Sequence, residues 1–367
     1  MPQGRPTEIP DGNEAHCRAV IEAHLGGYRP LLRPPLPRMA DAGHGRIVGV
    51  TSGSGWRAAN AGAYGVAKRA VAALTWQLGH QAPPGVTVNA LSPIALTRMA
   101  LEAIARAGAG RSGASGGLAL TTGMPEPEAI GPFGAHLTGP GLEWCTGQVL
   151  FGGGTELAVV EPPRLLEVIQ ADEATARGVV AAALPRVLAP AEAAQRSAGG
   201  GNPRLTAASA DALDAADLAC GVVVADPALA SAVSEALRAR GARVLPLGPS
   251  TVAPGFAGAT AAVRALAEQA GHLDALVLAA PGEPESRPST DAGWDRLLTE
   301  HEGLVAGLVD DAAWARAVAD HTAETTRPVR LVRLTDASTS GGRSRAQAVT
   351  QLARAAGVHL VLATQRP

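Results

Sequence analysis

The stretch that decides the fold is residues 45–99, GRIVGVTSGSGWRAANAGAYGVAKRAVAALTWQLGHQAPPGVTVNALSPIALTRM. It opens with a short, nearly continuous apolar run bounded by glycine and serine, which is typical of a buried parallel strand. The pattern then predicts a helix over 63–78 that ends at Gly79, and a second strand over 86–90 that Pro93 ends. Strand, helix and strand in this order form a βαβ crossover, so we expect an α/β sheet.

Two side chains on the expected helix suit proton transfer. Tyr64 and Lys68 lie one turn apart, so both project from the same helix face. An ammonium beside a phenol stabilises the phenolate, and we expect Lys68 to lower the pKa of Tyr64 from about 10 toward neutral pH. Ser52 lies in the turn just upstream and is placed to hold the oxygen of a carbonyl or alcohol substrate. The three groups suit a carbonyl/alcohol redox reaction but do not supply the hydride.

The spacing Tyr-x-x-x-Lys is a weak signal by itself, because both residue types are common. Here Lys68 is the only lysine among 31 basic residues, and Tyr64 is one of only 2 tyrosines. Lysine is a compact point charge that can serve both a phenolate and a ribose hydroxyl, whereas guanidinium is a planar fork. The alternative is a surface lysine beside a core tyrosine.

These residues together resemble the short-chain dehydrogenase/reductase superfamily. The resemblance covers the strand 46–51, the Ser-Gly-Ser-Gly turn 52–55, Tyr64 and Lys68, the strand 86–90, Asn89-Ala-Leu-Ser-Pro93 and Thr97-Arg-Met99. It looks closest to the branch of (3R)-hydroxyacyl-CoA dehydrogenases, on the evidence of His24-Leu-Gly-Gly, the Ser-x-Ser-Gly turn and Pro93-Ile-Ala-Leu-Thr-Arg-Met99.

The resemblance implies roles for individual residues. Ser52 would orient the substrate, Tyr64 would be the acid/base, and Lys68 would bind the nicotinamide ribose of NAD or NADP. Asn89, Pro93 and Thr97 would border the nicotinamide. Two features depart from the family: the loop between Ser52 and Tyr64 is one residue short, and His24 stands where most members have a structural asparagine.

Composition excludes several other classes of protein. The net charge of −2 gives no electrostatic reason to expect nucleic acid or an anionic membrane as a partner. Three scattered cysteines fit neither a disulfide framework nor a zinc site, and the 9 histidines include no pair at metal-helix spacing. The N-terminus does not resemble a signal peptide, and no apolar run approaches about 18 residues. We therefore expect a cytoplasmic protein without metal.

The rest of the first half is less regular. Residues 14–40 have a helical period, but prolines between 30 and 37 predict a broken helix. Residues 106–125 correspond to the family's substrate loop or to a disordered insert. Residues 146–154 resemble the family's last strand, which ends its sheet, and 161–170 resemble the tail after it. No glycine-rich turn for the pyrophosphate precedes residue 46, so the first half of a dinucleotide fold is expected to be missing.

A second α/β pattern follows a linker. We predict a catalytic half-domain over 1–170, a linker over 171–205, and a degenerate domain of the same type over 206–367, all Rossmann-like with doubly wound parallel sheets. In the second domain the expected strands are 220–225, 243–247, 274–280, 329–335 and 358–363, and the expected helices are 227–240, 259–270, 294–320 and 344–356.

The second domain lacks the functional residues. Asp226 stands near the place of the glycines and would repel a pyrophosphate. Alignment of the equivalent strands puts Asp336 opposite Ser52. Alignment of residues 347–349 with 69–71 puts Gly342 and Ala346 opposite Tyr64 and Lys68. We interpret this domain as catalytically silent.

Three hypotheses for the whole chain follow. The first is an NAD(P)-dependent oxidoreductase that interconverts a hydroxyl and a ketone, such as a 3-hydroxyacyl/3-oxoacyl thioester. The second is a cofactor-free scaffold or partner subunit, and the third is a start codon assigned too late. For assembly we predict an intrachain pseudo-dimer, in which helices 14–40 and 63–78 pack on 294–320 and 344–356, or a homo-oligomer.

Overall fold

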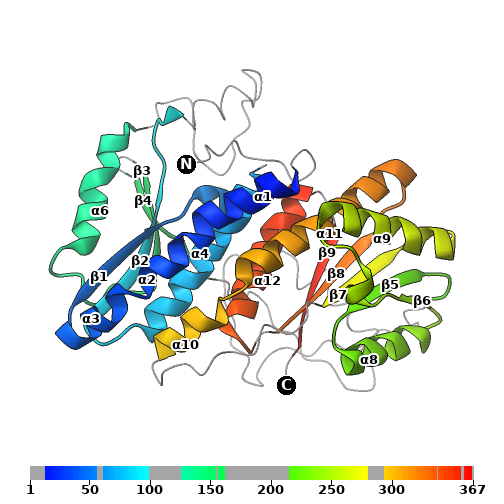
Figure 1. Ribbon diagram of the computed structural model, residues 1–367. Coiled ribbons are helices and arrows are strands. Elements are labelled where there is room, and N and C mark those ends of the chain that lie inside the picture. The colour runs from blue at the N-terminus through cyan, green and yellow to red at the C-terminus, as the bar shows by residue number, and fades with distance from the viewer. Residues whose placement is uncertain are drawn as a thin grey trace, which may run out of the picture.

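The computed structural model describes residues 13–55, 61–98, 125–153, 156–160, 162, 215–279, 293–336, 338–356 and 359–365. Two separate sheets organise these residues, with a layer of helices between them (Figure 1). The predicted substrate loop, tail and linker lie almost entirely outside the described residues. The described residues confirm an α/β fold with parallel sheets of the Rossmann type.

The first sheet has the order β1-β2-β3-β4, formed by Gly45–Val50, Val86–Pro93, Val149–Gly153 and Glu156–Val160. β1, β2 and β3 are parallel, as expected for the crossover. β4 pairs antiparallel with β3, so the prediction that residues 146–154 end the sheet was wrong. A chain that reverses directly after a strand can add an antiparallel neighbour, and the apolar run Leu157–Val160 favours an extended backbone.

Helix α4 (Gly62–Gln81) covers one face of this sheet and α6 (Gly131–Thr138) the other. Successive residues of a strand point to opposite faces. Ala90 of β2 therefore packs in one cluster with Trp76 of α4, whereas the neighbouring Leu91 lies against Gly134 of α6. The apolar positions of α4 are fully buried because this helix also contacts the second half of the chain.

α4 does not end at Gly79, as the sequence pattern predicted, but continues to Gln81 and stops before Pro83. Gly79 is required for another reason. A β carbon at this position would overlap the backbone of Gly147, in the loop before β3. The glycine thus allows a close approach of two backbones instead of marking a helix end.

Gly79→Ala is expected to lower the free energy of unfolding by about 1–3 kcal/mol, because the loop at Gly147 must move away from α4. Chemical denaturation measures this. Gly134→Ala is the matched control, since it also lies inside a helix but meets only Leu91, at 3.8 Å. The free energy of unfolding of this control should rise by up to about 1 kcal/mol, because alanine favours the helix more than glycine does. Equal effects of the two variants would contradict the assigned role of Gly79.

The segment before β1 is a broken helix, as predicted. It consists of α1 (Glu14–Ile21), a π-helical turn η1 (Glu22–Gly26), α2 (Tyr28–Leu32) and α3 (Pro35–Ala42). The break between α2 and α3 coincides with the adjacent prolines 34 and 35, and Pro35 takes the first turn of α3, where a missing N–H is tolerated.

The second sheet is entirely parallel, with the order β6-β5-β7-β8-β9. Its strands are β5 (Ala219–Val224), β6 (Arg243–Pro246), β7 (Ala275–Ala279), β8 (Arg330–Asp336) and β9 (His359–Gln365), and its helices are α8 (Pro227–Arg238), α9 (Gly255–Ala270), α10 (Gly293–Glu300), α11 (Leu304–Thr325) and α12 (Ser340–Ala356). α8 covers one face, while α9, α11 and α12 belong to the core on the other. The helix predicted over 294–320 is two helices, because Gly303 has φ +83° and breaks the chain before α11.

The layer between the sheets is built by α1 and α4 from the first half and α11 and α12 from the second (Figure 1). One hydrophobic cluster runs through all four helices and includes Ile21, Val66, Leu308 and Leu352. Polar contacts cross the same layer: the Gln77 side chain donates to Ser344 Oγ at 2.8 Å, and Glu14 accepts from the Phe256 backbone N at 3.0 Å. The four helices that were predicted to meet are therefore in contact.

None of the helices in the described ranges is both long and apolar enough to cross a membrane.

Candidate functional site

The turn after β1 is held tightly against α4. Thr51 Oγ1 donates to the Lys68 backbone O at 2.7 Å, and a β carbon on Gly55 would lie 2.9 Å from the Arg69 backbone N. From the second half of the chain, Gln351 Nε2 donates to Ser54 O at 3.0 Å. Gly55 is needed here because only a residue without a β carbon permits this approach, which fixes the turn that carries Ser52 beside α4.

Ser52, Tyr64 and Lys68 form one cluster at the carboxyl end of β1. The Ser52 side chain lies close enough to the Tyr64 phenol to act on its pKa, and Lys68 Nζ lies 5.6 Å from the centre of the Tyr64 ring. Lys68 is 8% exposed, and its Nζ donates to Val50 O at 2.9 Å. The helical spacing thus placed phenol and ammonium on one face, as predicted.

The predicted effect on acidity was wrong. Burial raises the pKa of Tyr64, and the Ser52 side chain opposes that rise without overcoming it. Lys68 contributes little because its ammonium points to the carbonyl of Val50, at the end of β1, and lies over the ring instead of beside the hydroxyl. Burial also lowers the pKa of Lys68, to about 8, so most of the ammonium remains charged at pH 7.

His24 also belongs to this cluster. In the sequence, this residue supported the resemblance and also marked a departure from the family, but its place beside Tyr64 was not predicted. Its ring meets the Tyr64 ring edge-on, with centroids 4.9 Å apart and planes at 82°. Burial, and secondarily the charge of Lys68, lowers the pKa of His24 to about 4, so the imidazole is neutral at pH 7. Its position in the π-helical turn η1 aims it at the phenol, and periodicity for an ordinary helix does not predict that turn.

The other three predicted site residues, Asn89, Pro93 and Thr97, lie on β2 or just after it. Asn89 is 2% exposed, and its side chain donates to Cys145 O and accepts from Gln148 N, both at about 3 Å. These bonds tie β2 to the loop before β3, and the position of Asn89 beside a nicotinamide stays a prediction. Pro93 ends β2, and Thr97 follows at the same edge of the sheet as Ser52, since Thr51 N bonds to Leu91 O at the end of the register.

The corresponding places in the second half hold no equivalent of this cluster. Asp226 caps α8, with Oδ1 accepting from Leu229 N at 2.8 Å, so a carboxylate already occupies the helix N-terminus that would face a pyrophosphate. Asp336 lies exposed at the end of β8 and accepts from Ser338 at 2.6 Å. A β carbon on Gly342 would overlap Asp336 O. Across the described ranges, no three His, Cys, Asp or Glu side chains gather as metal ligands would.

The family described as enoyl-(acyl carrier protein) reductase, one of the short-chain dehydrogenases/reductases, matches residues 3–154. The first part of this chain is thus similar to the short-chain dehydrogenase/reductase superfamily. The match covers the whole Ser52, Tyr64 and Lys68 cluster and stops at the end of β3.

One solved structure extends the likeness of fold to the second half. The N-domain of a bacterial malonyl-CoA reductase, solved with NADP, is 15% identical with a TM-score of 0.52, and the alignment covers 85% of this chain and 59% of that one. The TT0495 protein from Thermus thermophilus is 29% identical over 40% of this chain and 63% of its own, with a TM-score of 0.32. A short chain dehydrogenase from Mycobacterium avium is 25% identical over 48% and 58%, with a TM-score of 0.36.

This chain thus spans between 58% and 63% of the length of these three structures. No curated protein matches the sequence.

Proposed function

We propose that this protein is an NAD(P)-dependent oxidoreductase that interconverts a ketone and a secondary alcohol. The observation that carries the proposal is the cluster of Ser52, Tyr64 and Lys68, in which the only lysine of the chain lies beside one of its two tyrosines. A 3-oxoacyl or 3-hydroxyacyl thioester is the substrate class that the resemblance to (3R)-hydroxyacyl-CoA dehydrogenases favours.

Each residue of the cluster has a distinct task in this proposal. Ser52 donates a hydrogen bond to the substrate oxygen, and Tyr64 Oη gives that oxygen a proton in reduction or takes one in oxidation. Because burial raises the pKa of Tyr64, the phenol keeps its proton at neutral pH, which suits reduction of a carbonyl. The neutral His24 packs against the ring and limits its rotation without adding a second charge.

The residues fit one end of a nicotinamide cofactor. When bound, such a cofactor supplies or accepts the hydride. Lys68 uses one of its three N–H donors on Val50 O and keeps its charge at pH 7, so it is suited to a ribose hydroxyl. Pro93 and Thr97 would border the nicotinamide at the same edge of the sheet. The pyrophosphate has no glycine-rich cradle among the described residues of the first sheet.

Binding of NADPH and NADH to the full chain tests the proposal. We expect saturable binding with a Kd below about 1 mM, followed by the fluorescence of the reduced nicotinamide. Lys68→Met should weaken binding about 10- to 100-fold, because it removes a charged donor from a buried site. Arg69→Met is the matched control: it removes the neighbouring cation, which stacks on Trp76 instead. The proposal fails if neither nucleotide binds at millimolar concentration.

A scaffold or partner subunit without cofactor is the second candidate. It is favoured by Asp226, which fills the N-terminus of α8, and by the absence of a glycine-rich turn in the described part of the first sheet. This candidate predicts a folded protein with the same melting temperature with and without NADPH, whereas a ligand at 100 times its Kd adds about 2.7 kcal/mol of stability.

For assembly, we infer that the second half acts as a built-in dimer partner for the first. The shared hydrophobic cluster and the bond from Gln351 to Ser54 O support this, because the second half steadies the turn that carries Ser52. The inference predicts a monomer in solution, because α4 and α12 already cover each other's exposed faces within one chain. Sedimentation or light scattering measures this.

A further inference from the structure

A cavity of about 470 Å³ lies in the second half of the chain, away from the Tyr64 cluster. The side chains of Val223, Leu278 and Ala279 line it from the carboxyl ends of β5 and β7. These two strands flank the point where the sheet order β6-β5-β7 reverses direction. Open α/β sheets bind ligands in this crevice, and the volume lies within the range of small-molecule sites.

Two arginines reach this cavity and share one carboxylate. Arg345 donates to Asp311 from Nε at 2.7 Å and from Nη2 at 3.0 Å, and its Nη2 also bonds to Gly307 O. Arg333 is 2% exposed, and its Nη2 lies 3.1 Å from Asp311 Oδ1. These two guanidinium groups and the shared carboxylate carry one excess positive charge, which Asp310 at the same cavity offsets when it is ionised.

Arg333 has hydrogen-bonding capacity to spare. Its Nε and Nη2 are buried, and neither has a hydrogen-bond partner among the described residues, so its contact with Asp311 is one of charge alone. These two nitrogens form one edge of the guanidinium, which is the edge that binds a carboxylate through two parallel N–H donors. A buried donor without a partner is costly, so the arrangement calls for an acceptor.

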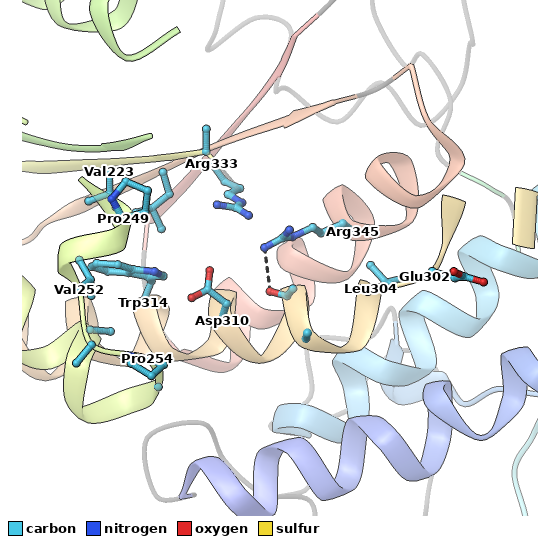
Figure 2. Close-up of a pocket in the computed structure, with 18 residues that line it drawn as sticks. Val223, Pro249, Val252, Pro254, Glu302, Leu304, Asp310, Trp314, Arg333 and Arg345 are labelled. Carbon is cyan, nitrogen blue, oxygen red and sulfur yellow. Dashed lines mark hydrogen bonds between the residues drawn. The ribbon is translucent and has the colours of Figure 1, made fainter. Parts of the chain in front are cut away.

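Figure 2 shows how the polar groups converge. Arg333 points from β8, Arg345 from α12 and Asp310 from α11 toward the middle of the cavity. Its other walls are apolar and include Val252, Leu278 and Trp314. Glu302 lies at one side and already pairs with Arg29 at 3.5 Å and Arg33 at 3.6 Å, so Asp310 is the carboxylate that opposes an incoming anion.

We propose that this cavity binds a small organic carboxylate, with its anionic group on Arg333 and its apolar body against Trp314 and Leu278. The site is distinct from a dinucleotide site, because Asp226 occupies the N-terminus of α8. The second half of the chain is then a ligand-binding unit as well as a packing partner.

Isothermal titration of the full chain with 2-naphthoate and with its neutral analogue 2-naphthamide tests the proposal. The acid should bind at least about 10-fold more tightly than the amide, which corresponds to one charged pair of hydrogen bonds. Arg333→Met should remove that difference in affinity, because it should weaken the binding of 2-naphthoate and leave the binding of 2-naphthamide unchanged. Asp310→Asn should increase the affinity for 2-naphthoate several-fold, because it removes the negative charge that opposes the carboxylate. Arg264→Met, an exposed arginine that pairs with Glu324, should change nothing.

A second variant guards against misfolding of Arg333→Met. Ala306 lines the cavity from an exposed position on α11, so Ala306→Trp narrows the space without touching the buried charges. This variant should weaken the binding of both 2-naphthoate and 2-naphthamide, while its circular dichroism spectrum stays unchanged. Equal affinities of acid and amide for the unmodified chain, absence of binding of both, or unchanged binding of the acid in both variants would overturn the proposal.

Discussion

Tyr64→Phe is expected to reduce kcat for ketone reduction by about 10²- to 10⁴-fold, the contribution of a positioned proton donor. The substitution removes only the oxygen that exchanges the proton, and the ring retains its edge contact with His24. NADPH consumption with a 3-oxoacyl thioester measures the loss. KM should change little, because Ser52 still holds the substrate oxygen.

The chain provides its own control for this variant. Tyr28, the other tyrosine, lies over Gly49 of β1 with its hydroxyl buried. Tyr28→Phe should leave kcat within about twofold, since burial of this phenol serves packing and not chemistry. A comparable loss of kcat in both variants would assign the effect to folding, and full activity of Tyr64→Phe would remove the proposed acid/base.

The sequence predicted the order of strands and helices well because its apolar runs are short and bounded by glycine, serine and proline. The misplaced boundaries have specific physical causes. Gly79 resembles a helix stop but serves a backbone approach to Gly147, and Gly303 resembles an interior helix residue but breaks the chain with φ +83°. A glycine allows a turn, a contact or a positive φ, and tertiary structure decides among them.

The candidate site was predicted in its members more than in its electrostatics. Helical spacing placed Tyr64 and Lys68 together, since that relation is local. The direction of the Tyr64 pKa shift depended on the burial of the pair and on the direction of Lys68 Nζ. The latter is set by β1, because Val50 O accepts a hydrogen bond from the ammonium. Asn89 was assigned to the cofactor from its place in a motif, but its partners Cys145 and Gln148 are distant in sequence.

Asp311→Asn is expected to lower the free energy of unfolding by about 3–5 kcal/mol, the cost of breaking a buried ion pair by removing one partner. Asp311 is 3% exposed and is the carboxylate that Arg333 and Arg345 share. The amide leaves the two guanidinium groups without the buried carboxylate that they share, and only Asp310 remains as a nearby negative charge. Thermal unfolding should show a fall in Tm on the order of 10 °C.

The matched control is Asp320→Asn, which breaks an ion pair with Arg316 on the same helix α11. The side chains of that pair are partly exposed, at 26% and 39%, so its loss should cost less than about 1 kcal/mol. The double variant Asp311→Asn with Arg333→Met should be more stable than Asp311→Asn alone, because only one guanidinium then lacks a partner. Similar losses in Asp311→Asn and Asp320→Asn would contradict the central role of the buried cluster.

The same carboxylate gives the stability a defined pH dependence. Burial by itself raises the pKa of Asp311, but Arg333 and Arg345 outweigh it and hold the pKa below its usual value. A group whose pKa is lower in the folded state than in the unfolded chain contributes stability above the unfolded pKa, about 3.9 for aspartate, and loses it as the pH falls. The difference in unfolding free energy between the unmodified chain and Asp311→Asn should therefore be constant from pH 7 to about pH 5 and shrink below pH 4. A difference that grows on acidification would mean that Asp311 takes up a proton more readily in the folded protein than in the unfolded chain, and the two arginines would then lose their shared counter-charge.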